Sequence, residues 1–520
     1  MKSRTLTRIT AMTLFAALTI LIGQRLAAQE QQQQEPKKEH ARYKLIDLET
    51  FGGPASYFQN GFDGILNNHG TAAGWADTST PDPFPTACFN PDCFVSHTFQ
   101  SQNGVLTDLG SLAPGWSSSA FWISHNGLIA GWSQNGVIDP LVSIPENHGV
   151  LWRNGQITDL GTLGGGYDSF ATSVNSRGEV VGAALNTISD PFCLFAPGFC
   201  VTQTRAFLWH NGAMQDLGTL GGPDAFAVFV NERSQVAGTS YLSSIPNPSN
   251  GSCPPNVPTQ DPFFWEKDKM VDIGTLGGTC GFPTALNTRG QVVGQSNLAG
   301  NLSFHPFVWT KSRGIQDLGT LGGDNGLTNW INDAGEIVGK TDLPGPPPQN
   351  HDAVLWRNGV MTDLGTLPGD SCSNAYYVNL LGQVVGTSEP RALCPGPCTM
   401  NCAGVHAFLW EDGGPMVDLN SLIAPGSSLQ LTYAVAINER GEIAGFGVPP
   451  GCSPANYGTC GHAYVLIPCS EGDEDCGDSA APTTPAVSER PKVVLPENVS
   501  QPTWHRRAFG RFGSRMMLPE

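Results

Sequence analysis

One short pattern recurs eight times between residues 43 and 468, and it constrains the fold more than any other feature. It is clearest where Asp159-Leu-Gly-Thr-Leu-Gly-Gly165 is followed by Val174-Asn175-Ser-Arg-Gly178 and then by Arg205-Ala-Phe-Leu-Trp209. A period of this length is typical of units that bury their apolar faces only against one another. With 63 glycines, 40 prolines and 14% charged residues, the composition favours an all-β fold.

Each unit contains four predicted strands. The first ends at the Asn of an Asn-x-x-Gly turn, as in Ala227–Asn231, which suits a type I turn. The second is of the Val-Val-Gly type, and we expect it to end at the glycine. These glycines are Gly74, Gly131, Gly182, Gly238, Gly294, Gly339, Gly386 and Gly445. The third carries a recurring tryptophan: Trp152, Trp209, Trp265, Trp309, Trp356 and Trp410. The fourth carries an Asp-Leu pair, whose aspartates include Asp159, Asp216, Asp272, Asp317 and Asp363.

The ends of the repeat region predict a closed arrangement. The region starts with a lone strand of the fourth type at residues 43–48 and ends with one of the third type at residues 462–467. The N-terminal strand is therefore expected to complete the last sheet and cover its edge. Four antiparallel strands per unit, apolar on both faces, predict a β-propeller with eight blades. Seven blades with one displaced unit is the alternative, and an open solenoid would require capping repeats that are not seen.

The recurring motifs resemble the HAF repeat, the "probable extracellular repeat" of exported bacterial proteins. Three motifs carry the resemblance in fixed order over most of residues 43–468, and the HAF motif is intact at His406–Trp410. The resemblance implies an exported bacterial protein but no reaction. The motif histidine is assigned to His97, His148, His305, His351, His406 and His462, with Arg205 and Asp261 in two copies. This variation argues against a ring of functional histidines.

The termini and the charge indicate where the protein works. Residues 1–28 are predicted to be a secretory signal, with an uncleaved anchor as the alternative, and residues 29–42 a flexible leader. Residues 469–520 form a predicted flexible tail with a basic end, which either docks on an acidic surface or stays free. A net charge of −18 argues against nucleic acid and anionic membranes as partners. We therefore expect a secreted, periplasmic or envelope protein with no membrane span after signal cleavage.

Fourteen cysteines fit an oxidising compartment. Four close pairs are predicted to form local disulfides: Cys88 with Cys93, Cys193 with Cys200, Cys452 with Cys460, and Cys469 with Cys476. The remaining group of Cys372, Cys394, Cys398 and Cys402 is compatible with two disulfides or with a zinc site. Export favours the disulfides.

Antiparallel connectivity places every long insertion on one face of the repeat region, which is the usual arrangement of a binding face. Trp75, Trp116 and Trp132 depart from the repeat on this face, and as exposed side chains they would stack on a sugar or anchor a protein. The alternative is that they cover apolar loop surface. We therefore expect a non-catalytic module for a protein or carbohydrate ligand, with a secreted polysaccharide hydrolase or lyase and a structural envelope component as alternatives.

No cofactor, metal or catalytic residue is predicted. The recurring aspartates are expected to bind backbone N–H groups of the following glycine-rich turn rather than a metal. Neither Gly-x-Ser-x-Gly nor His-Glu-x-x-His occurs. Carboxylates predicted at or near the long-loop face give a polysaccharide hydrolase its candidate acids, although none stands out as a pair. They are Asp77, Asp168, Asp224, Asp324 and Asp370.

Overall fold

The fold is described from a computed structural model of the chain. It covers residues 40–58, 64–85, 88, 90, 92–192, 194, 201–247, 257–346, 350–390, 404–411, 413–452, 457–470 and 476. The chain divides into two compact units, Met1–Arg42 and Tyr43–Glu520. The predicted signal, most of the leader, most of the tail, and Cys193 and Cys200 lie outside the described residues.

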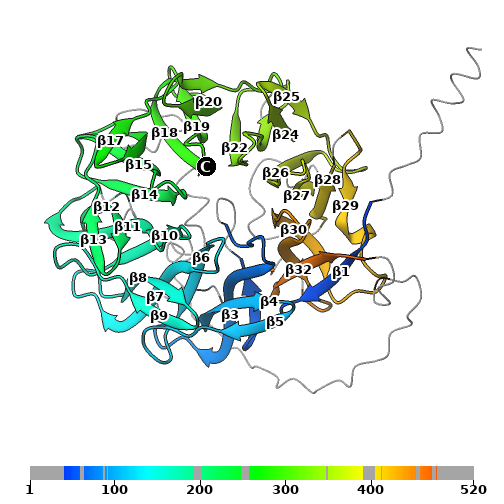
Figure 1. Cartoon of the computed structure of the whole chain (residues 1–520), viewed down its shortest axis with the longest axis horizontal. Coiled ribbons are helices and arrows are strands. Elements are labelled where there is room, and N and C mark those ends of the chain that lie inside the picture. The colour runs from blue at the N-terminus through cyan, green and yellow to red at the C-terminus, as the bar shows by residue number, and fades with distance from the viewer. Residues whose placement is uncertain are drawn as a thin grey trace, which may run out of the picture. The chain divides into compact units, whose positions relative to one another are not determined.

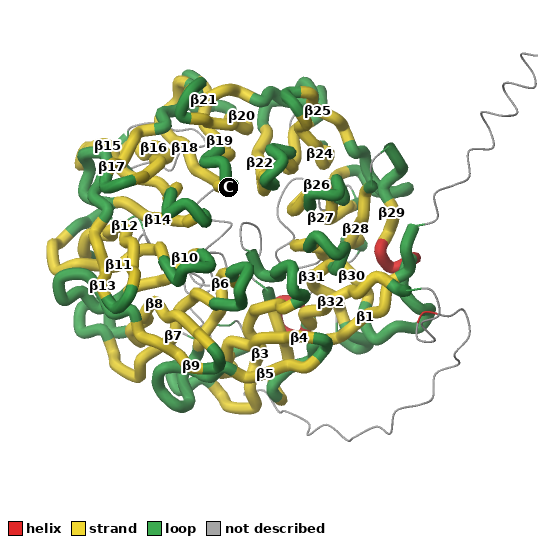
Figure 2. The backbone as a smooth tube through the Cα atoms, viewed as in Figure 1, coloured by secondary structure: helices red, strands yellow, loops and turns green. Residues whose placement is uncertain are grey.

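The unit from Tyr43 onward is built almost entirely of β-strands (Figures 1 and 2). The first four sheets are formed by β2 (Gly52–Tyr57), β3 (Thr71–Pro81), β4 (Phe94–Gln102), β5 (Val105–Asp108); β6 (Ser118–Ile123), β7 (Ile129–Ile138), β8 (Pro145–Arg153), β9 (Gln156–Asp159); β10 (Ser169–Val174), β11 (Val180–Ser189), β12 (Thr202–His210), β13 (Ala213–Asp216); and β14 (Ala225–Val230), β15 (Val236–Pro246), β16 (Pro258–Glu266), β17 (Lys269–Asp272).

The later sheets follow the same order. They are formed by β18 (Gly277–Leu286), β19 (Val292–Leu298), β20 (Phe304–Thr310), β21 (Gly314–Asp317); β22 (Gly326–Ile331), β23 (Ile337–Asp342), β24 (His351–Arg357), β25 (Val360–Asp363); β26 (Cys372–Val378), β27 (Val384–Glu389), β28 (His406–Trp410), β29 (Val417–Asp418); and β30 (Gln430–Ile437), β31 (Ile443–Val448), β32 (His462–Pro468), β1 (Tyr43–Asp47). The helical elements are a 3-10 turn, η1 (Leu419–Ser421), and α2 (Tyr457–Cys460).

The sheet topology is antiparallel within each unit, as the repeat predicts. Strands pair in chain order, for example β10-β11-β12-β13. A single parallel bridge, Gln260 to Cys280, joins the fourth and fifth units into one eight-stranded sheet. The last sheet has the order β1-β32-β31-β30, and Tyr43 to Asp47 pair in register with Pro468 to Tyr464. Strands from the two ends of the repeat region therefore share a sheet.

The core lies between successive sheets. In one such cluster, Leu151 from β8 packs with Ala171 from β10 and Phe207 from β12. The recurring tryptophans are all buried: Trp152, Trp209, Trp265, Trp309, Trp356 and Trp410. The indole N–H of Trp152 donates to the Leu109 carbonyl of the preceding unit at 3.2 Å. Both faces of each sheet are thus covered, which explains why the strands lack a polar–apolar alternation.

The second strand of each unit is longer than predicted. In the first four units it runs 10 or 11 residues, as in Thr71–Pro81, whereas the later ones have six or seven. Pairing with the third strand continues beyond Gly74 to the bridge between Pro81 and Phe94. The glycine lies inside the strand. A glycine is needed there because a Cβ at position 74 would meet the Tyr57 carbonyl oxygen at 2.2 Å. It marks a close backbone approach rather than a strand end.

The assignment of His351 to the HAF motif is wrong. In the other units the motif residue lies two positions before the residue that pairs with the fourth-strand aspartate, as His148 does relative to Val150 and Asp159. In the sixth of these units Val354 pairs with Asp363, so Asp352 holds the motif position. A one-residue shift moves a side chain to the opposite face of its strand. His351 therefore belongs to a different environment.

Three predicted local disulfides are present: Cys88–Cys93, Cys452–Cys460 and Cys469–Cys476. Cys372 is also disulfide-bonded, which removes it from the alternative zinc site. Among the residues that the structure describes, no helix has the length and apolarity needed to cross a membrane.

Candidate functional site

The predicted exposure of the candidate tryptophans is wrong for two of them. Trp75 and Trp132 are 8% and 2% exposed, and Trp116 is half-buried. Trp132 packs against Phe170 of the next unit with ring centroids 6.1 Å apart, and Trp75 stacks on Tyr57. The position after the second-strand glycine faces the neighbouring sheet, so its side chain enters the core rather than the loop surface.

Lys340 is the exception at this inter-sheet position. The equivalent residues of the other seven units are all uncharged: Trp75, Trp132, Ala183, Thr239, Gln295, Thr387 and Phe446. Lys340 follows Gly339 in β23 and pairs with Ala353 in β24. Its side chain is half-buried, and burial lowers the pKa of its amine, against the opposing charges of Glu389 and Asp342. A lysine at a position built for uncharged side chains is the sequence signal that marks this site.

His351 lies beside this amine. Its Nε2 is 3.4 Å from Lys340 Nζ, and the side chain belongs to the first residue of β24. Burial and the charge of Lys340 lower the pKa of the imidazole to about 2, so the ring is neutral at any ordinary pH. A neutral ring nitrogen can accept a hydrogen bond from the amine without adding a positive charge.

Glu389 supplies an acid to the same cluster. It is the last residue of β27 and half-buried. Burial raises the pKa of its carboxyl to about 7, in opposition to Lys340 and a hydrogen bond from Thr387, while Asp370 raises it further. Asp370 itself is 3.1 Å from Nδ1 of His406. Strands β23, β24, β27 and β28 therefore bring together an amine with a lowered pKa and a carboxyl with a raised one.

The other predicted carboxylates mostly have structural roles. Asp168 Oδ1 accepts a hydrogen bond from the Asn147 N–H at 2.8 Å, and Asp224 accepts from the backbone N–H groups of Thr204 and Leu194. Asp77 is fully buried and accepts from Ala55 N–H. Burial raises the pKa of all three carboxyls. Asp324 is exposed.

The fourth-strand aspartates form the predicted hydrogen bonds to the glycine turn. Each Oδ1 accepts the N–H of the glycine two residues on at 2.7–2.8 Å. These aspartates are Asp108, Asp159, Asp216, Asp272, Asp317 and Asp363. In four of these units the same carboxylate also contacts the side chain at the HAF position at 2.9 Å: His97, His148, Arg205 and His305. In the last unit His462 contacts Asp47 at the same distance. The HAF histidine thus holds the third strand to the fourth.

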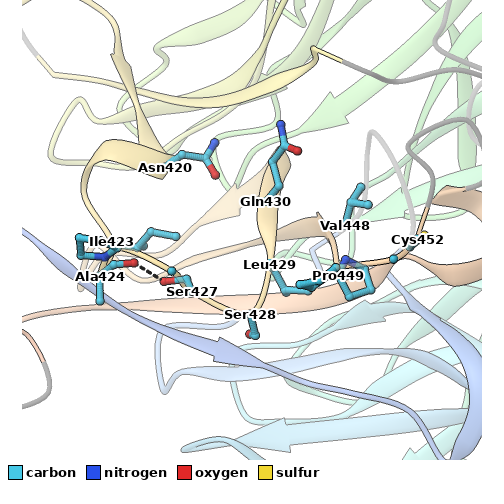
Figure 3. A pocket seen from close by; sticks show the side chains of 14 residues that line it. Asn420, Ile423, Ala424, Ser427, Ser428, Leu429, Gln430, Val448, Pro449 and Cys452 are labelled. Atoms are coloured by element: carbon cyan, nitrogen blue, oxygen red, sulfur yellow. Dashed lines mark hydrogen bonds between the residues drawn. The ribbon is translucent and has the colours of Figure 1, made fainter. Parts of the chain in front are cut away.

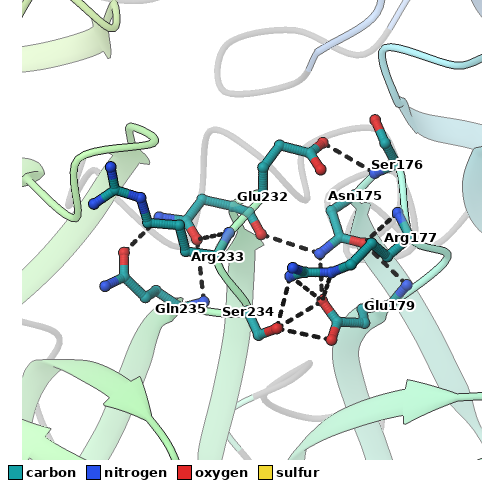
Figure 4. A network of polar contacts seen from close by, with 9 residues as sticks. Asn175, Ser176, Arg177, Glu179, Glu232, Arg233, Ser234 and Gln235 are labelled. Atoms are coloured by element: carbon teal, nitrogen blue, oxygen red, sulfur yellow. Dashed lines mark hydrogen bonds and ion pairs between the residues drawn. The ribbon is translucent and has the colours of Figure 1, made fainter.

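The Asn-x-x-Gly turns lie on the face opposite the long insertions, and hydrogen bonds link them from unit to unit. Asn175 Oδ1 accepts the Arg177 and Glu179 N–H groups, while its Nδ2 donates to the Asn231 carbonyl at 3.0 Å (Figure 4). The same donation recurs from Asn67, Asn231, Asn287, Asn332, Asn379 and Asn438. The last of these reaches the Asn67 carbonyl, 371 residues away in the sequence, at 3.0 Å.

Ser234 replaces the turn glycine in the fourth unit without loss of the turn. Its φ is +59°, a conformation that favours glycine. Its hydroxyl donates to Glu179 at 2.8 Å and lies 2.7 Å from Arg177 Nη2 (Figure 4). These contacts with the preceding unit offset the backbone strain.

A pocket of about 470 Å³ lies between the segments 420–430 and 448–452 (Figure 3). Its lining contains no ionisable side chain. The Asn420 side chain is occupied by hydrogen bonds with Asp418 and with the backbone of Leu431. The pocket offers a surface for binding but no group for proton transfer.

Among the described residues, no group of three or more His, Cys, Asp and Glu side chains is arranged to hold a metal ion. The cluster around Lys340 is the candidate functional site because its amine has a lowered pKa and its carboxyl a raised one.

No protein-family model matches this chain, and no curated protein matches it. Solved structures of similar arrangement include the β-propeller domain of the Trilobed protease from Pyrococcus furiosus, with a TM-score of 0.38, 9% identity and coverage of 73% of this chain and 98% of that domain. An acylaminoacyl peptidase from Pyrococcus horikoshii has a TM-score of 0.37 and 9% identity over 78% of this chain and 58% of its own. A puromycin-hydrolyzing peptidase from Mycobacterium tuberculosis has a TM-score of 0.40 and 12% identity over 78% and 62%.

The burial of Trp75 and Trp132 removes two of the three side chains on which the expectation of a non-catalytic binding module relied. The binding-module hypothesis is therefore withdrawn.

Proposed function

We propose that this protein is an exported enzyme that cleaves an amide or ester bond by general acid–base catalysis at Lys340 and Glu389. One observation carries the proposal: a lysine amine occupies a position that is uncharged in the seven other units, beside a neutral imidazole and a carboxyl whose pKa is about 7. Perturbed pKa values of this kind cluster at functional sites.

The two groups divide the proton transfers of hydrolysis. In its neutral form, which the lowered pKa favours, the amine of Lys340 takes a proton from water as the water oxygen attacks the carbonyl carbon. The protonated carboxyl of Glu389 gives its proton to the leaving nitrogen or oxygen as that bond breaks. The products are a carboxylic acid and an amine or alcohol. The proton gained by Lys340 then returns to Glu389, which restores both groups and balances the protons. His351 positions the amine, since its Nε2 lies 3.4 Å from Nζ.

The test is an assay of the intact protein on fluorogenic peptides and nitrophenyl esters. Proton transfer by a positioned side chain contributes about 10²–10⁴-fold, so Lys340→Met and Glu389→Gln should each lower kcat by at least about 100-fold. Lys311→Met is the matched control, because the Lys311 side chain is 72% exposed and pairs only with Glu266 among described contacts. Retained activity in Lys340→Met, or no hydrolysis of either substrate class by the natural protein, would contradict the proposal.

The pH dependence gives a second readout. Glu389 must be protonated to act as an acid, and burial raises its pKa to about 7. Activity should therefore fall as the pH rises above about 7, and this limb should disappear in Glu389→Gln. An unchanged alkaline limb in that variant would assign it to another group.

We further propose that the eight units form a closed ring of HAF repeats. The pairing of β1 with β32, the hydrogen bond from Asn438 to Asn67, and the donation from Ser56 N–H to the Gly461 carbonyl at 3.0 Å support this arrangement. Export is supported by the three disulfides. In a ring of this kind the Lys340 site lies between the sixth and seventh blades.

A further inference from the structure

In most units the side chain at the HAF position contacts the fourth-strand aspartate. In five units a His or Arg side chain lies 2.9 Å from that carboxylate. The same two hydrogen bonds flank the contact from unit to unit. In the second unit, for example, Leu160 N–H donates to the Gly149 carbonyl and Gly161 N–H donates to Asp159 Oδ1. A His or Arg side chain beside the aspartate is thus a repeated feature of the described units.

Two units keep these backbone hydrogen bonds but have a second carboxylate in place of the His or Arg side chain. In one, Asp352 faces Asp363, with Leu364 N–H donating to the Ala353 carbonyl and Gly365 N–H to Asp363 Oδ1 at 2.8 Å. In the other, Asp261 and Asp272 are arranged in the same way around the Ile273 and Gly274 N–H groups. Two aspartates therefore interact in each of these units, where five other units pair an aspartate with a His or Arg side chain.

The Asp352–Asp363 pair contains an unsatisfied buried atom. Asp352 is 8% exposed, and its Oδ1 is shielded from solvent with no hydrogen-bond partner. Its carboxyl lies within hydrogen-bonding reach of Asp363, and the charge of Asp363 adds to burial in raising the Asp352 pKa to about 6. Burial and Asp272 likewise raise the Asp261 pKa to about 7. Asp272 and Asp363 are exposed, so an ion from solvent can reach both pairs.

We propose that each of these carboxylate pairs binds a divalent cation of the calcium class, which takes the place of the His or Arg side chain of the other units. Carboxylate oxygens are the ligands that such hard cations prefer. The described residues supply no third carboxylate, imidazole or thiolate to either pair, so water completes the coordination. Affinity should accordingly be in the weak range of extracellular calcium modules, about 10⁻⁴–10⁻³ M.

The test is the stoichiometry of Ca²⁺ bound to the full chain at pH 8, measured by equilibrium dialysis. Asp352→His restores the His–Asp pair of the other units, so it should remove one bound ion while the protein stays folded. Asp261→His should remove the other, and the double variant should lose both. The gain-of-function control is His148→Asp, which should add one ion by creating a third carboxylate pair with Asp159.

A drop of one ion per substitution, with the gain in His148→Asp, supports the proposal. An unchanged stoichiometry in Asp352→His and Asp261→His, or no Ca²⁺ binding by the natural protein at pH 8 in the millimolar range, overturns it. If the natural protein binds no Ca²⁺, each aspartate pair holds a shared proton instead. Thermal unfolding of every variant checks that the loss of an ion is not a loss of fold.

Discussion

Buried carboxylates join the loop that leads into one unit to a strand of the preceding unit. Asp168 is 7% exposed, and its Oδ1 accepts the Asn147 N–H from the preceding unit. Burial is the largest cause that raises its pKa to about 7, and Asp139 and Glu146 add to it. Such a group is more stable protonated in the folded state than in the unfolded chain, where the carboxyl pKa is about 3.9.

The free energy of unfolding should therefore fall as the pH rises from about 4 to about 7, and then level off. Asp168→Asn keeps an acceptor oxygen for Asn147 and carries no charge. It should remove this part of the pH dependence and stabilise the protein at pH 8 by up to about 4 kcal/mol, since one pKa unit corresponds to about 1.4 kcal/mol. Urea unfolding at pH 5 and pH 8 measures this, with exposed Asp324→Asn as the control. A variant less stable than the natural protein at both pH values would contradict this account.

At the residue scale the sequence predicts local contacts better than exposure. The hydrogen bond from Gly161 N–H to Asp159 depends on residues two apart, and the spacing alone indicated it. The burial of Trp75 and Trp132 depends on the neighbouring sheet, which no local pattern describes. Lys340 is the one charged residue among the eight that follow the second-strand glycine, and the sequence shows this. That the position faces a neighbouring sheet is known only from the structure.

At the element scale the Asn-x-x-Gly turn does more than reverse the chain. Asn231 Oδ1 accepts the Arg233 and Gln235 N–H groups, and its Nδ2 donates to the Asn287 carbonyl of the next unit at 2.9 Å. The side chain is 5% exposed, so these hydrogen bonds are shielded from water. One residue thus stabilises its own turn and the contact between two units.

Asn231→Ala removes all of these hydrogen bonds and should lower the free energy of unfolding by about 2–4 kcal/mol, at about 0.5–1.5 kcal/mol for each bond. Guanidinium unfolding monitored by tryptophan fluorescence measures the change. Asn211→Gly is the control, because Asn211 lies in a hairpin turn at φ +51° that glycine adopts freely, so its effect should be small. Equal effects of the two substitutions would show that the contact between units contributes little.

Strand order and pairing followed from the repeat, whereas strand ends and one register did not. The Val-Val-Gly pattern predicts a strand end at the glycine, whereas Gly74 allows close backbone packing within a longer strand. The motif predicts His351 at the HAF position, and only the pairing of Val354 with Asp363 identifies Asp352 there instead. Sequence patterns leave a shift of one residue undetermined when both faces of a strand are buried.

At the scale of the whole molecule, β1 protects the edge of the last sheet. All five of its residues pair with β32, and Tyr43 N–H donates to the Leu422 carbonyl at 2.9 Å. Without β1, the backbone of β32 would present unpaired groups to solvent, which is a template for pairing with other chains.

A variant lacking residues 43–47 should therefore self-associate and unfold at lower temperature than the natural protein. Light scattering and thermal unfolding at several protein concentrations measure both effects. A variant lacking residues 29–39, which lie in the predicted leader, is the control and should behave like the natural protein. A monomeric variant without residues 43–47 and of undiminished stability would contradict the proposed closure by β1.

The central claim is that Lys340 provides an amine of lowered pKa next to Glu389, and the most direct measurement is the titration of that amine. Lysine amines labelled by reductive ¹³C-methylation are followed by NMR as the pH is raised, with Lys340→Met identifying the signal. The account predicts that Lys340 titrates below the ordinary lysine value of about 10.4. Glu389→Gln should lower the pKa further, because the Glu389 charge favours the protonated amine. A Lys340 signal that titrates at the ordinary value, unchanged in Glu389→Gln, would contradict the proposed site.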